Sequence, residues 1–146
     1  MKTFKNLSQQ ENDALLKYPV YISELAANGD GIFDEAEKKS AVSLAIIKAY
    51  SSEPLLACFH KEIEKVLEHN MELLDKELPK EKMSREVILR MKILQLEKIV
   101  LKLGKRRASA IHRSMQTFKE HVLKAHHNVL VDFIIPISIP GFTESK

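Results

Sequence analysis

The sequence contains very little cysteine, glycine and proline, and it contains no tryptophan. Its single cysteine, Cys58, excludes a disulfide framework and any zinc site built on cysteine ligands. Four glycines and five prolines are too few for a turn-rich β-sandwich or a glycine-rich nucleotide loop. The 146 residues are 45% hydrophobic and 29% charged, which is typical of one globular domain covering residues 1–146.

Long hydrophobic runs are also missing. The longest apolar stretch, residues 129–139, is interrupted by Asp132 and Pro136 and is too short to cross a bilayer. No apolar stretch follows the first residues, so the pattern of a secretory signal is not found there. We therefore expect a soluble, cytoplasmic protein without a transmembrane segment.

The two halves of the chain carry opposite net charge. Residues 1–79 hold 9 Lys/Arg against 14 Asp/Glu, whereas residues 80–146 hold 14 against 6. This pattern has two interpretations: acidic and basic helices neutralise each other within one domain, or the basic half contacts nucleic acid or anionic lipid. The basic positions are Lys98, Lys102, Lys105, Arg106, Arg107, Arg113, Lys119 and Lys124. Only Phe118 lies among them as an aromatic residue, which disfavours nucleic acid.

Capping residues and prolines divide the first half into helices. The capping box at residues 8–11 opens a short helix, and Pro19 occupies the first turn of a second helix. Asp34, with Glu37 three residues later, opens a third helix, whose run 41–47 is apolar on most sides, so this helix is expected to be central and largely buried. The segment 51–54 opens a fourth helix, which ends at residues 78–79 because a residue before proline avoids helical geometry.

Two apolar seams with alternating three- and four-residue spacing follow, separated by Gly104. The first seam is Leu89, Ile93, Leu96, Val100 and Leu103; the second is Ala108, Ile111, Met115, Phe118, Val122, Ala125 and Val129. We expect two antiparallel helices with a turn at Gly104, since one helix over residues 80–132 would be about 80 Å long. A long helix in a coiled-coil dimer is the alternative. The predicted fold class is therefore all-α: a single compact bundle of five to seven helices with an extended apolar C-terminal tail.

Residues 26–37 partly match the twelve-residue calcium loop of an EF-hand. The matching positions are the third, fifth, sixth, ninth and twelfth, held by Asn28, Asp30, Gly31, Asp34 and Glu37. Ala26 stands at the first position and has no side-chain oxygen, so a cation would bind weakly, at about 0.1–1 mM. Hard oxygen ligands favour calcium, magnesium or manganese. The other interpretation is a turn between helices, with Asp34 capping the second of them.

The same region resembles a known family. Small residues at Ala26 and Ala27, then Asp30-Gly31 and a glutamate-opened helix continuing to Val42, resemble the repeated motif of TerB-like, tellurite-resistance-type domains. The family's second Asp-Gly motif has no counterpart in residues 80–146. The resemblance implies a compact helical bundle, a divalent-cation site at Asp30, Asp34 and Glu37, stress-response partners at the membrane, and no established enzymatic activity.

Other chemistry has little support in the sequence. No two of the histidines at 112, 121, 126 and 127 are four residues apart, so surface or cap positions rather than a zinc site are expected for the six histidines, His60 included. Cys58 lies between Ala57 and Phe59 and is predicted to be a buried, inert thiol.

We therefore predict a non-enzymatic TerB-like interaction module. It would bind a protein partner or form a homodimer through the helical seams or the C-terminal tail. The alternative is a basic helical adaptor for nucleic acid or an anionic membrane surface.

Overall fold

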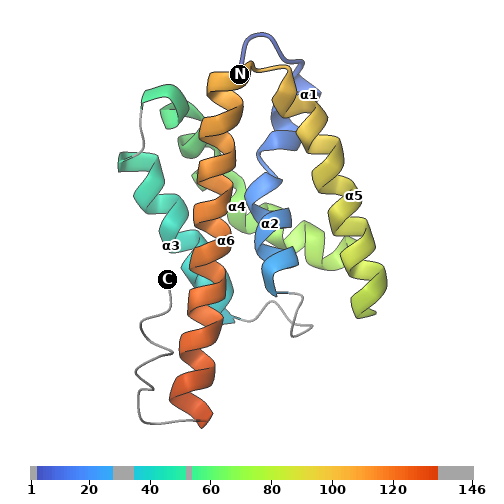
Figure 1. Ribbon diagram of the computed structural model, residues 1–146, viewed down its shortest axis with the longest axis vertical. Helices are drawn as coiled ribbons and strands as arrows, with labels where there is room; N and C mark the ends of the chain where they lie inside the picture. The colour runs from blue at the N-terminus through green and yellow to red at the C-terminus, as the bar shows by residue number, and fades with distance from the viewer. Residues whose placement is uncertain (1–2, 28–34, 52–53, 135–146) are drawn as a thin grey trace.

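The computed structural model describes residues 3–27, 35–51 and 54–134 (Figure 1). Within these ranges the chain forms six α-helices and a short 3-10 turn, and no strand. The elements are α1 (Gln9–Leu15), α2 (Tyr18–Ala27), α3 (Glu35–Ser51), η2 (Pro54–Leu56), α4 (Ala57–Glu77), α5 (Lys82–Leu101) and α6 (Lys105–Ile134). The predicted all-α class is confirmed. The expected C-terminal tail, residues 135–146, lies outside the described residues.

The N-terminal segment is held by hydrogen bonds that the sequence specifies locally. In α1 the backbone N–H of Glu11 donates to Ser8 Oγ at 3.0 Å, and the backbone N–H of Ser8 donates to the Glu11 carboxylate at 2.9 Å, which is the predicted capping box. The buried Asn12 side chain then accepts from the backbone N–H of Phe4 at 2.8 Å. These bonds place the Phe4 ring in the core, beside Phe59.

Helix α2 is central to the bundle. It contacts α3, α4, α5 and α6, and in Figure 1 it lies between α5 and α6. Its first turn contains Pro19, as predicted, because proline needs no backbone donor there. The side chains that it buries include Tyr18, Val20 and Glu24. A carboxylic acid at the centre of a bundle requires a polar partner, because acidic residues are rarely buried without one.

The chain turns between α5 and α6 at Gly104, whose φ of +91° is accessible to glycine without strain. The two helices therefore run antiparallel, as predicted, and the alternative of one continuous helix is wrong. Figure 1 shows that they diverge from the turn and that α2 fills the space between them. The described positions of both predicted seams face this interior, apart from the partly buried Ile93. The chain's own core therefore uses the two seams.

Helix α3 differs from its prediction. Ala41, Leu44 and Ala45 are buried, whereas Ile47 is 55% exposed. The run is therefore not buried on all sides, because α3 packs on α4 and α6 and leaves one face open. None of the described helices is both long enough and apolar enough to cross a membrane.

Candidate functional site

The buried acid of α2, Glu24, lies against Asp75 of α4. Burial raises the pKa of Glu24 to about 8, and a hydrogen bond to Asp75 and the negative charge of Asp75 act in the same direction. Arg85 and Lys38 oppose this shift with their positive charges. Lys38 of α3 also forms an ion pair with Asp75 at 3.0 Å. Glu24 of α2, Asp75 of α4 and Lys38 of α3 thus form one polar cluster that links three helices.

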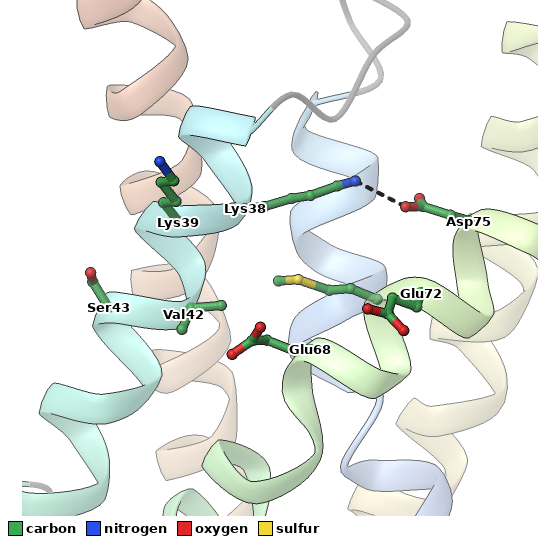
Figure 2. A pocket seen from close by; sticks show the side chains of 8 residues that line it. Lys38, Lys39, Val42, Ser43, Glu68, Glu72 and Asp75 are labelled. Carbon is green, nitrogen blue, oxygen red and sulfur yellow. Dashed lines mark hydrogen bonds and ion pairs between the residues drawn. The ribbon is translucent and has the colours of Figure 1, made fainter.

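An open groove of about 490 Å³ lies next to this ion pair, between α3 and α4 (Figure 2). Figure 2 shows Lys38 reaching across to Asp75, Glu68 pointing towards Val42, and Lys39 pointing away from α4. Most of its lining side chains are charged, with lysines on α3 facing carboxylates on α4, and no histidine or cysteine is among the lining residues. Its lining residues are Lys38, Lys39, Val42, Ser43, Glu68, Met71, Glu72 and Asp75.

Of the three residues predicted to bind a cation, only Glu37 belongs to the part of the chain that the structure describes. Asp30 and Asp34 lie outside the described residues. Glu37 belongs to the first turn of α3, and its side chain is completely buried. Among the described residues, no group of three or more histidine, cysteine or acidic side chains could hold a metal ion. The cation site at Asp30, Asp34 and Glu37 stays a prediction.

A serine and a histidine meet in the interior. His60 Nε2 of α4 lies 2.7 Å from Ser114 Oγ of α6. The expectation that histidines lie at the surface is wrong for His60, which is 2% exposed. Burial, followed by the charge of Lys48, lowers its pKa to about 4, so the ring is neutral at pH 7. Ser114 is buried as well, so a substrate cannot reach this pair and its role is structural.

A second polar contact joins three helices near the end of α5. Tyr18 of α2 donates a hydrogen bond to Glu97 of α5, and His112 Nε2 of α6 lies 2.7 Å from the same carboxylate. Burial and this hydrogen bond raise the pKa of Tyr18 well above its usual range. The tyrosine therefore stays neutral and fixes the Glu97 side chain.

Cys58 also departs from its prediction. It is exposed at the start of α4, whereas the neighbouring Phe59 is buried. Adjacent residues on a helix point in directions about 100° apart, so an apolar neighbour does not guarantee burial. Cys58 is one of the residues that line an open surface depression at the start of α4.

The outward face of α5 is the most unusual feature of the surface. It carries five apolar side chains that are 48–75% exposed: Met83, Val87, Met91, Leu94 and Leu101. Their spacing of four, four, three and seven residues places them along one face. Residues 83 to 101 are 18 apart, or about 27 Å along the helix axis. Leu89, Leu96 and Val100 occupy the opposite face and fill the core. We name these five exposed residues the α5 stripe.

The α5 stripe was not singled out from the sequence, although its signal is there. Counting helical spacing from Met83 gives a second apolar row beside the seam that begins at Leu89. The structure decides which row faces the core: α5 packs on α2 through the buried seam, whereas the α5 stripe stays exposed on a helix at the edge of the bundle (Figure 1). None of the described segments covers it, since its residues stay exposed.

The basic residues of the second half that were named above are all exposed, and those at positions 102 and 105–107 follow Leu101, the last residue of the α5 stripe, in the chain. Comparisons of the chain with protein-family models, with curated proteins and with solved structures find no match. The assignment of function therefore depends on the geometry of the chain itself.

Proposed function

We propose that this chain is a non-enzymatic helical interaction module that docks onto another macromolecule through the α5 stripe. We also propose that the module is TerB-like, because part of its sequence resembles that family. The observation that carries the proposal is that α5 has two apolar faces. One face fills the core, and the other exposes five large side chains in a row.

An exposed row of this kind has a thermodynamic cost. Covering one leucine or methionine side chain is worth about 1.5–3 kcal/mol relative to leaving it in water. Isolated exposed apolar residues are ordinary, but a contiguous patch is typical of an interaction site. Folding does not need these five side chains, because they point away from the core. A binding partner would cover these five side chains and remove the cost of exposing them to water.

The polar clusters support a non-enzymatic role. Glu24, Asp75 and Lys38 link three helices, and the His60–Ser114 pair is sealed inside the bundle. These contacts link helices of the bundle, and within the described residues they leave Glu24 Oε2 and His60 Nδ1 buried without a hydrogen-bond partner. The α3–α4 groove is open and lined by charged side chains of both signs.

Site-specific photocrosslinking tests the proposal without assuming a partner. A benzophenone amino acid replaces Leu94 in the α5 stripe, and a matched variant carries it at Leu123, an exposed leucine of α6. We expect discrete ultraviolet-dependent adducts to protein or lipid in cells from position 94 and not from position 123. Identical adduct patterns from both positions, or none from position 94, would contradict the proposal.

A further inference from the structure

The surroundings of the α5 stripe indicate the chemistry of its partner. Cationic residues dominate the exposed surface of α5 and the turn that follows it. Lys98 lies one turn from Leu94 and one turn from Leu101 on the same face. Lys105 and Arg106 begin α6, immediately after the turn. An apolar row with cations at its edge is complementary to a partner that has an apolar interior and an anionic outer layer.

The cations near Leu101 are available for a partner. Lys98, Lys105, Arg106 and Arg107 form no ion pair or side-chain hydrogen bond with any of the residues that the structure describes.

The nearby acids, by contrast, are engaged. Glu97 accepts from Tyr18 and contacts His112, Glu86 pairs with Arg90 at 3.0 Å, and Glu81 caps α5 by accepting from Ser84. The free charge around the α5 stripe is therefore positive.

From this juxtaposition we infer that the partner of the α5 stripe is an anionic lipid surface, an inference that rests on the proposed docking function. The helix would lie in the plane of the membrane interface with its five apolar side chains among the acyl chains. An interfacial helix buries its apolar face to about 5–10 Å in this way. Lysine and arginine side chains extend from the edges of such a helix towards lipid phosphates.

Charge and shape favour a lipid surface over a second copy of the chain. Residues 80–146 carry 14 Lys/Arg against 6 Asp/Glu, so two copies joined at α5 would bring two positive surfaces together. Helix α5 lies at the edge of the bundle (Figure 1), and because the five exposed residues share one face of it, a flat surface can contact all of them at once. Anionic lipid supplies both the apolar phase and the negative charge.

Co-sedimentation of the full chain with vesicles tests the inference. One vesicle contains phosphatidylcholine alone, and the other contains equal parts of phosphatidylcholine and phosphatidylserine. We expect binding to the phosphatidylserine vesicles only, weakening as ionic strength rises towards about 0.15 M. Leu94→Glu should weaken this binding at least tenfold, since it removes apolar contact and adds a charge of the wrong sign. Lys98→Gln should weaken it about fivefold, because one basic residue near such a surface is worth about 1 kcal/mol.

Leu123→Glu is the matched control, because it places the same charge at an exposed leucine of another helix, and its binding should equal that of the wild type. Absence of vesicle binding, or binding that Leu94→Glu leaves unchanged, would overturn the lipid inference. If position 94 still crosslinks to a protein in that case, the docking function stands and the lipid assignment alone is wrong. Sedimentation equilibrium tests whether a second copy of the chain binds the α5 stripe instead. A wild-type dimer that Leu94→Glu dissociates would assign the α5 stripe to a second copy and overturn the inference.

Discussion

Glu24 of α2 lies against Asp75 of α4, and Asp75 forms an ion pair with Lys38 of α3 at 3.0 Å, at the junction where the three helices meet. Glu24 is buried, so its ionised form would lose hydration and face a second carboxylate. Protonated Glu24 can instead donate a hydrogen bond to Asp75, which also contacts Lys38 at 3.0 Å. The arrangement makes the stability of this junction depend on pH.

The free energy of unfolding should fall as pH rises through the range of this titration. The pKa of Glu24 is raised from 4.5 when unfolded to about 8 when folded, so the folded state binds more protons between these values. The contribution of Glu24 to the free energy of unfolding is complete below pH 4.5 and is lost by about pH 8. Over this range the free energy of unfolding should fall by at most about 1.4 kcal/mol per pH unit. Urea unfolding of the wild type and Glu24→Gln over this range measures it.

The difference between these two proteins isolates Glu24. Buried His60 acts in the opposite direction, since its pKa falls to about 4 and the unfolded state binds more protons up to pH 6.5. Both proteins share this effect, so it cancels in the comparison. Glu24→Gln should gain stability relative to the wild type as pH rises, because an amide cannot ionise. Parallel stability curves for the two proteins would show that Glu24 does not hold this proton.

The bond between Ser114 and His60 should contribute measurably to stability. Ser114→Ala leaves His60 Nε2 buried without the hydroxyl that lies 2.7 Å away. We expect a loss of about 1–3 kcal/mol in the free energy of unfolding, the usual cost of an unsatisfied buried polar group. Ser109→Ala, an exposed change on the same helix, should be neutral or slightly stabilising. Equal effects of the two substitutions would mean that the hydroxyl gives no specific support.

The two faces of α5 should differ sharply in their importance for folding. Leu89 is fully buried and Leu94 is 65% exposed. Leu89→Ala should cost about 2–5 kcal/mol, because it removes buried contacts and leaves a cavity. Leu94→Ala should change stability by less than about 0.5 kcal/mol, as surface substitutions usually do. Thermal or urea unfolding of both variants checks this contrast. A large loss for Leu94→Ala would mean that the α5 stripe belongs to the fold rather than to a binding surface.

The cation loop can be tested by thermal unfolding with and without millimolar calcium, magnesium or manganese. A weak site at Asp30, Asp34 and Glu37 predicts a rise in Tm that Asp30→Asn abolishes. A simple turn predicts no change. We expect no change, because Ala26 supplies no side-chain oxygen and Glu37 is completely buried. A cation-dependent rise that Asp30→Asn removes would contradict this expectation.

Local signals in the sequence predicted the helices well. The Ser8 capping box, Pro19, the stop at Leu78 and the turn at Gly104 each depend on backbone chemistry within a few residues. Such features need no knowledge of the rest of the fold. The sequence therefore predicted the elements and their order.

The tertiary features could not be predicted in the same way. Cys58 and Ile47 are exposed and His60 is buried because of which neighbours each helix meets, and periodicity alone does not specify these neighbours. The contact between Glu24 and Asp75 joins residues far apart in the chain. Two apolar rows on α5 were readable from the sequence, but only the packing of α2 decides which row faces outward.

The most direct test of the α5 stripe as a membrane-docking surface uses the absence of tryptophan from the chain. Leu94→Trp places a single fluorophore in the stripe, and Leu123→Trp places one on α6. When phosphatidylserine-containing vesicles are added, the emission of the first should shift to shorter wavelength, because the indole leaves water. The emission of the second should not change. An emission of Leu94→Trp that stays fixed on addition of these vesicles would contradict the account.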